Sequence, residues 1–144
     1  MSSSSSTEDL WVEDIESATL KNKFWRDVLF TSDNLQVVVM SVPPKQSLGW
    51  EMHRKSDQFF RIEGGKGLFQ IGEKEGGKVS PTQEALLEDG MVTVIPHGTW
   101  HNVTNTSSRS NLKFYAIYGP PHHRPGTRDT THRAEKIRTS KRRR

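Results

Sequence analysis

The sequence predicts an all-β protein, a single antiparallel sandwich or barrel. Six short segments rich in β-branched and aromatic residues follow one another in the middle of the chain, and glycine, proline or aspartate separates them. No segment of useful length between them has the 3.6-residue hydrophobic period of a helix, so a parallel β–α–β fold is not expected. A length of 144 residues fits one domain.

The expected elements begin with a short helical lead-in within the acidic, weakly amphipathic residues 8–22, capped by Thr7 or Asp9. Four apolar residues would share one side of it: Leu10, Trp11, Ile15 and Leu20. The expected strands are residues 35–40, 59–63, 68–71, 91–95, 100–105 and 112–118. The glycine-rich residues 64–67 are expected to form a hairpin turn between the second and third strands.

Composition divides the chain into three regions. Residues 1–7 form a polyserine leader, residues 8–124 the barrel domain and residues 125–144 a basic tail, and we expect both ends to be flexible. The tail carries eight basic and two acidic side chains, whereas residues 1–124 carry thirteen basic and fifteen acidic ones. The net charge of +4 therefore comes from the tail. The mildly acidic body argues against nucleic-acid binding by the domain itself.

The composition also excludes several kinds of site. The chain has no cysteine, so disulfides, thiolate nucleophiles and sulfur-ligated metals are excluded, and any metal must have nitrogen and oxygen ligands. No apolar run approaches the ~20 residues of a membrane-spanning helix. The serine-rich start lacks the features of a secretory signal. We expect an intracellular protein, cytoplasmic by default.

The most informative pattern lies between Gly90 and Asn105. Gly90 allows a turn into a strand, and Pro96 and Gly98 favour a tight reversal of the chain. His101 would then begin the next strand with its side chain directed into the interior. Asn105 would hold a neighbouring loop through its side-chain amide.

This spacing resembles the second motif of the cupin superfamily at every fixed position. The first cupin motif usually reads Gly, five residues, His-x-His, three or four residues, Glu, six residues, Gly. The corresponding residues here are Glu51, His53, Gln58 and Gly65. Glutamate therefore replaces the first histidine, glutamine replaces the usual glutamate, and Lys45 stands where the leading glycine is expected.

The resemblance implies a metal site built from Glu51, His53, Gln58 and His101. Glu51 and His53 are two residues apart on an extended chain, so their side chains share one side. Two imidazoles, a carboxylate and an amide oxygen suit divalent Fe, Mn, Zn, Ni or Co. Because an amide oxygen is a weaker ligand than a carboxylate, we expect a lower metal affinity than with the usual glutamate.

Three segments narrow the resemblance to small single-domain cupins of the mannose-6-phosphate-isomerase-like subgroup: residues 57–64, 95–102 and 112–121. The Glu-x-His and Asp-Gln-Phe forms also occur in that subgroup. The resemblance covers roughly residues 18–131 and implies an antiparallel jelly-roll barrel with a central metal. It implies no particular reaction, because one fold supports many functions.

The predicted function is a metal-binding cupin that binds or transforms a small oxygenated molecule, such as a sugar derivative. Phe60, Trp100 and Tyr118 are weaker candidates for the wall of the ligand pocket, with core filling as the alternative role, above all for Phe60. The sequence assigns no catalytic residue. If the protein is an enzyme, we expect metal-dependent isomerase-like or non-haem dioxygenase-like chemistry.

The alternative is a non-catalytic cupin that serves as a structural or assembly module. We expect a homodimer, since cupins commonly pair through their sheets. The basic run from Arg138 to Arg144 would contact an acidic partner or nucleic acid, would be a nuclear-targeting segment, or would be a solvated tail.

Overall fold

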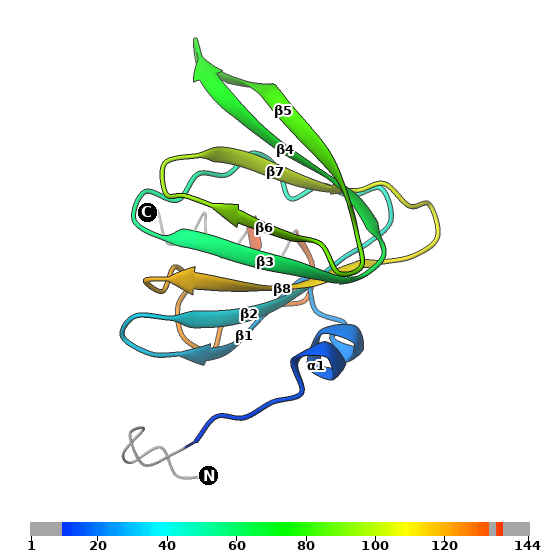
Figure 1. Cartoon of the computed structure of the whole chain (residues 1–144), viewed down its shortest axis with the longest axis vertical. Helices are drawn as coiled ribbons and strands as arrows, with labels where there is room; N and C mark the ends of the chain where they lie inside the picture. Colours follow the sequence, from blue (N-terminus) through cyan, green and yellow to red (C-terminus); the bar gives the residue numbers. More distant parts are fainter. Residues whose placement is uncertain (1–9, 133–134, 137–144) are drawn as a thin grey trace.

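The computed structural model describes residues 10–132 and 135–136 and shows two antiparallel β-sheets packed face to face (Figure 1). This confirms the predicted all-β jelly roll. The predicted barrel is not closed, because within the described residues the two sheets remain separate hydrogen-bonded units. The fold is therefore a sandwich, with the core between the sheets.

The large sheet contains β1 (Arg26–Thr31), β2 (Gln36–Val42), β3 (Asp57–Gly64), β6 (Val92–Ile95), β8 (Leu112–Gly119) and β9 (Arg128–Asp129). Their spatial order is β6-β3-β8-β2-β1-β9. The small sheet contains β4 (Lys66–Glu75), β5 (Lys78–Glu88) and β7 (Trp100–Asn105), in the order β5-β4-β7. Inward-facing residues alternate with outward-facing ones along β3, β7 and β8, as the two-residue period of a strand requires.

The helical lead-in is shorter than the sequence predicted. Helix α1 (Ile15–Lys21) is capped by Asp14, whose carboxylate accepts a 3.1 Å hydrogen bond from the backbone N–H of Ser17. The expected cap at Thr7 or Asp9 is wrong for this helix. The Asp14 carboxylate accepts a hydrogen bond from a backbone N–H of the first turn, which has no partner within the helix. The helix therefore begins directly after Asp14. Helix α1 lies against the outer face of the large sheet (Figure 1).

Three strands, β1, β5 and β9, were not predicted from the sequence. The edge strand β5 is almost entirely exposed, and only Leu87 is buried. It also contains Pro81, which an edge strand tolerates because no partner requires its missing N–H. Strands β1 and β9 contain charged residues, which interrupt the hydrophobic alternation that identifies a strand in a sequence. Pairing with a neighbour, rather than local composition, makes these segments strands.

The glycine-rich segment after β3 is not a hairpin turn, as the sequence had predicted. Strands β3 and β4 follow one another in the chain but lie in different sheets, and Gly65 is the only residue between them. Gly65 has φ +88, and a Cβ there would lie 2.6 Å from the carbonyl oxygen of Asn111. Only glycine fits this crossing from one sheet to the other.

The first part of the segment expected as a basic tail packs on the large sheet. Strand β9 pairs with β1 in the register Arg26↔Asp129. The ring of His132 stacks on Trp25 at 4.4 Å between centroids. The division of the chain at residue 124 stays a prediction. The polyserine leader and the run from Arg138 to Arg144 lie outside the described residues.

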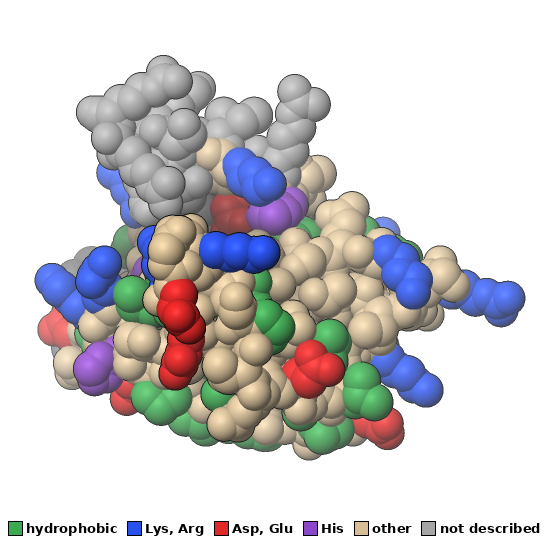
Figure 2. Space-filling view, turned by 90° about the horizontal axis from the view of Figure 1, so that it is seen from above, with side chains coloured by type: hydrophobic (Ala, Val, Ile, Leu, Met, Phe, Trp, Pro, Cys, Tyr) green, Lys and Arg blue, Asp and Glu red, His purple; other side chains and the backbone are tan. Residues whose placement is uncertain are grey.

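Charged side chains do not gather into a single field on the face seen in Figure 2. Lys and Arg side chains are spread over this view, and acidic side chains lie among them (Figure 2). None of the described helices has the length and apolar character needed to cross a membrane.

Asn105 joins three segments at the end of β7 and is fully buried. Its side-chain N–H groups donate to the carbonyl oxygens of Val42 (2.9 Å) and Ser110 (2.8 Å), and its oxygen accepts from the backbone N–H of Ser107 (2.8 Å). The amide holds the loop between β7 and β8 against the end of β2, as the sequence motif predicted.

We expect Asn105→Ala to lower the free energy of unfolding by about 2–4 kcal/mol, because it leaves buried backbone groups without partners. Urea denaturation monitored by tryptophan fluorescence measures this. Asn111→Ala is the control, since Asn111 is exposed and makes one side-chain hydrogen bond, to Ser41. Equal losses for the two variants would contradict the role assigned to Asn105.

Candidate metal centre

The chain between β2 and β3 runs beside β7 and extends the small sheet without forming a regular strand. Isolated bridges pair Ser47 with Thr104 and Glu51 with His101. Glu51 and His101 exchange two backbone hydrogen bonds, each 2.9 Å long. This pairing directs Glu51, and His53 two residues later, toward the same side as His101.

Lys45 begins this segment in an unusual backbone conformation. Its φ is +65, in the left-handed region that glycine adopts most easily. This is the position where the cupin pattern has a glycine. The Lys45 ammonium group donates to the carbonyl oxygen of Thr106 at 2.9 Å. The backbone at this position therefore has the positive φ typical of glycine, although the residue is a lysine.

The turn that precedes β7 is bonded to the segment that carries His53. The N–H of Gly98, which has φ +80, donates to the carbonyl oxygen of His53 at 2.7 Å. The N–H of His97 donates to the Asp57 carboxylate at 2.9 Å. Two backbone N–H groups of the second motif therefore bond to residues of the first motif. These bonds fix the position of His53 relative to His101.

Glu51, His53 and His101 come together as a potential metal-binding group. One donor atom from each lies within 4.8 Å of the others. The side chains of His53 and His101 are buried. Gln58, at the start of β3, places its amide oxygen 3.1 Å from Nε2 of His53. In an octahedral site with metal–ligand bonds of about 2.1 Å, neighbouring ligand atoms lie about 3.0 Å apart. The 3.1 Å between the Gln58 oxygen and Nε2 of His53 therefore also suits two ligands of one ion.

His101 has the arrangement typical of a metal-binding imidazole. Its Nδ1 lies 2.9 Å from the carbonyl oxygen of Thr99, which can only accept, so Nδ1 carries a proton and Nε2 is the atom that offers a lone pair in the neutral ring. Nε2 is buried and has no hydrogen-bond partner among the described residues. Metal-bound histidines commonly donate their second ring nitrogen to a carbonyl in this way. The residues therefore fit a divalent ion.

Burial keeps the metal-centre imidazole of His53 neutral. It lowers the pKa of His53 to about 3, and the neighbouring His122 and His101 add to the effect. Burial also raises the pKa of the Tyr118 hydroxyl, so this group keeps its proton. A neutral imidazole is the form that binds metal.

The structure separates the three candidate pocket residues. The ring of Tyr118 is buried and lies 5.5 Å from that of His53. Phe60 lies in the core, 5.0 Å from the ring of Phe114. Trp100 precedes the inward-facing His101 on β7, so its side chain lies on the outer face and not at the metal centre.

Residues that the sequence analysis did not assign also reach the metal centre. The ring of His122, in the loop after β8, lies 4.1 Å from that of His53. Buried Gln36 holds this loop, because its side-chain oxygen accepts from the backbone N–H groups of His122 (3.0 Å) and His123 (2.8 Å).

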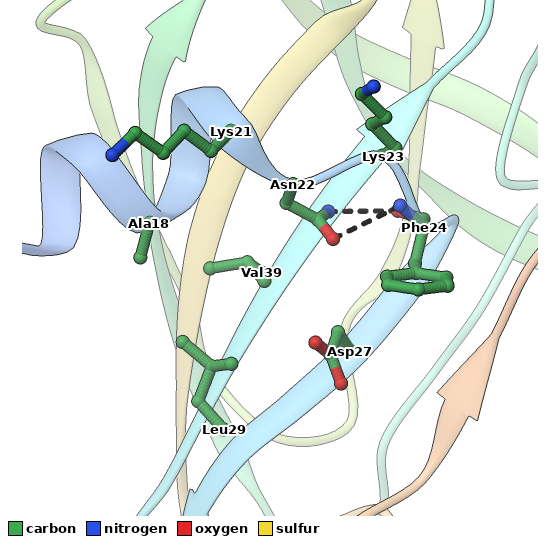
Figure 3. Close-up of a pocket in the computed structure, with 8 residues that line it drawn as sticks. All are labelled: Ala18, Lys21, Asn22, Lys23, Phe24, Asp27, Leu29 and Val39. Carbon is green, nitrogen blue, oxygen red and sulfur yellow. Dashed lines mark hydrogen bonds between the residues drawn. The ribbon is translucent and has the colours of Figure 1, made fainter.

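A separate pocket lies outside the sandwich, between α1 and the outer face of β1 and β2 (Figure 3). The Asn22 side chain closes one end by bonding both the N–H and the carbonyl oxygen of Phe24, at 3.1 and 2.9 Å. Ala18, Leu29 and Val39 form its apolar surface. None of the predicted site residues lines it.

Residues 38–118 match the protein family described as "Cupin domain". The chain belongs to the cupin family. The match contains the positions of all four predicted metal ligands of this cupin. It also contains Gly90, Pro96, Gly98 and Asn105 of the second motif.

Two curated proteins are similar to this cupin along most of its length. "Uncharacterized protein L612" of Acanthamoeba polyphaga mimivirus is 38% identical over 125 residues, which cover 87% of this chain and 74% of that protein. "Uncharacterized protein YrkC" of Bacillus subtilis (strain 168) is 39% identical over 117 residues, or 81% of this chain. The cupin spans 61% of the length of YrkC.

Solved structures agree with the fold. The crystal structure of BH2720 from Bacillus halodurans has a TM-score of 0.84 and 38% sequence identity, and the match covers 90% of this chain and 96% of that one. The cupin domain of Cnp3 from Schizosaccharomyces pombe, with a TM-score of 0.56, 14% identity and coverage of 65% and 59%, shows the fold alone. These relatives do not support the narrower mannose-6-phosphate-isomerase-like subgroup.

The glutamine in the predicted ligand set provides a direct test. We expect Gln58→Glu to bind divalent metal at least about tenfold more tightly, because a carboxylate adds a negative charge beside the ion. Competition with a coloured chelator measures the affinity. Gln83→Glu, on the exposed strand β5, adds the same charge away from the centre and should leave the affinity unchanged. Unchanged affinity in Gln58→Glu would remove residue 58 from the ligand set.

Proposed function

We propose that this cupin holds a divalent metal ion with Glu51, His53 and His101, and that Gln58 completes or modulates the set. At this ion it binds or transforms a small oxygenated molecule. The candidate ions are Fe, Mn, Zn, Ni and Co, which accept imidazole and carboxylate ligands.

The observation that carries this proposal is the buried Nε2 atom of His101. A buried polar atom usually has a hydrogen-bond partner, because leaving one unpaired costs about 1–3 kcal/mol. Here the opposite ring nitrogen is fixed by Thr99, and the lone pair of Nε2 has no partner among the described residues. The carboxylate of Glu51 and the imidazole of His53 lie within 4.8 Å. A cation satisfies all three groups together.

The surrounding residues can bind and orient a ligand. A bound divalent ion would supply Lewis-acid activation of a carbonyl or hydroxyl oxygen, or redox chemistry if it were iron. The Tyr118 hydroxyl, which burial keeps protonated, can donate a hydrogen bond to such a ligand. His122 adds a polar wall beside His53, and Gln36 holds its loop in place.

Metal analysis of purified protein tests this proposal. We expect His53→Ala and His101→Ala each to lose most of the bound metal, since each removes one of three strong donors. His97→Ala is the matched control, because His97 is exposed and the structure uses only its backbone N–H, which bonds Asp57. Inductively coupled plasma mass spectrometry gives the metal content per chain. Unchanged metal content in both centre variants would overturn the proposal.

The second candidate function is an assembly role, and one observation favours it. A row of apolar residues crosses the outer face of five strands of the large sheet. We call it the outer row, and it consists of Val94, Phe59, Ile117, Val37 and Phe30. Val94 is 63% exposed and the other four are half-buried. The outer face of such a sheet is normally polar, so this row suits contact with a second copy.

The homodimer can be tested with one substitution in this row. We expect Phe59→Lys to produce a monomer, because it buries a charge in the centre of a self-complementary interface. Size-exclusion chromatography with light scattering gives the molar mass. Leu86→Lys, at an exposed leucine on β5, is the control. A wild-type monomer at the highest soluble concentration would contradict the dimer.

The remaining parts of the assembly role have no structural support. The proposed contact of Arg138 to Arg144 with an acidic partner or nucleic acid concerns residues outside the described part of the chain. A cytoplasmic location, or a nuclear one through this basic run, likewise stays a prediction.

A further inference from the structure

We propose that the ligand of this metal centre carries a carboxylate that Arg26 binds, and that Glu135 occupies the position of this carboxylate in the free protein. The inference rests on the proposed function, because it concerns the ligand of the same centre. It adds the chemical class of that ligand: a small molecule with an oxygen donor at one end and a carboxylate at the other.

Arg26 is a fully buried cation in the interior of a small protein. It stands at the start of β1, where it alternates with the inward-facing Val28, and its side chain is among the largest that are fully buried. Its guanidinium contacts the sulfur of Met40 at 3.7 Å. Burying a charge is unfavourable unless an anion accompanies it. A cation in this position therefore requires a negatively charged partner.

The guanidinium of Arg26 is connected to the metal centre through Tyr118. Arg26 lies near enough to the Tyr118 hydroxyl to influence its pKa. The ring of the same tyrosine lies 5.5 Å from the ring of His53. One side chain thus separates the guanidinium from a metal ligand. A short molecule that coordinates the ion can extend along Tyr118 and place its far end at Arg26.

Glu135 shows that this position accepts a carboxylate. Its carboxylate forms an ion pair with Arg26 and accepts a 3.1 Å hydrogen bond from the indole N–H of Trp25. It is buried, with 8% of its surface exposed. Arg26 is the first residue of β1 and Trp25 directly precedes it, so the carboxylate-binding donors belong to the sandwich itself.

The carboxylate of Glu135 comes from a segment that lies outside the long strands of the sandwich. This segment joins the large sheet through the two-residue strand β9, the ion pair between Arg128 and Asp27, and the stacking of His132 on Trp25. A ligand carboxylate can replace Glu135 without breaking the main sheet. The charges favour an anionic ligand. The single carboxylate of the cluster, Glu51, offsets only half the charge of a divalent ion, and Arg26 adds a further positive charge.

The closing experiment measures the binding of simple probes to the metal-loaded full-length chain by calorimetry. The probes are succinate and glutarate, with propionate as the monocarboxylate that cannot contact the ion and Arg26 at the same time. We expect Glu135→Gln to bind one of the dicarboxylates at least tenfold more tightly than wild type does. Propionate affinity should rise less, because its single carboxylate cannot bind both sites together.

Three variants identify the contacts responsible. Glu75→Gln, at the exposed tip of the β4–β5 hairpin, removes the same charge elsewhere and should bind like wild type. Arg26→Lys, combined with Glu135→Gln, should lose the gain in dicarboxylate affinity, because lysine cannot form the two parallel hydrogen bonds of a guanidinium. Tyr118→Phe in the same background should weaken dicarboxylate binding more than propionate binding.

The outcomes separate this inference from the proposed function. Metal content is measured first, and its absence from wild type would overturn the proposed function. If Glu135→Gln retains metal but binds dicarboxylates no better than Glu75→Gln does, the inference is overturned and the Arg26–Glu135 pair is structural only. If Glu135→Gln lowers Tm, a dicarboxylate must restore the Tm of the metal-loaded form, since a ligand stabilises the state it binds. A failure to restore it also overturns the inference.

Discussion

The two backbone hydrogen bonds between Glu51 and His101 hold the metal centre together. They attach an irregular segment to β7, so that a carboxylate and an imidazole from distant parts of the chain face each other. The bond from the N–H of Gly98 to the carbonyl oxygen of His53 then places the imidazole of His53. Because these contacts use backbone groups, the three side chains keep their donor atoms available for an ion.

Buried polar side chains do much of the remaining positioning. Asn105 holds the loop after β7, Gln36 holds the loop that carries His122, and Arg26 pairs with Glu135. Buried polar groups stabilise a structure only when their partners are in place, so each of them favours one arrangement of its neighbours. The C-terminal end of the described chain is thereby joined to the large sheet.

Much of the fold was predictable because its signals are local. Alternating hydrophobicity located six strands, and Gly90 and Gly98 have the positive φ that their turns require. Prediction failed where a strand depends on its partner. Strand β5 is polar and contains Pro81, and β9 has two residues, so neither has a local signal. The spacing of the glycines after β3 resembled a hairpin, but only the packing of the two sheets shows that Gly65 crosses between them.

The sequence alone determined the chemistry available at the metal centre. It contains no cysteine, so the ligands of any metal are limited to nitrogen and oxygen, and the resemblance to the cupin motifs predicted the set Glu51, His53, Gln58 and His101. Only the tertiary structure decided what surrounds them. It placed Trp100 outside, Tyr118 beside His53, and Glu135 on the indole of Trp25, a residue 110 positions away in the sequence. The physical reason is that strand alternation and turns depend on neighbouring residues, whereas contacts between distant residues depend on how the sheets pack.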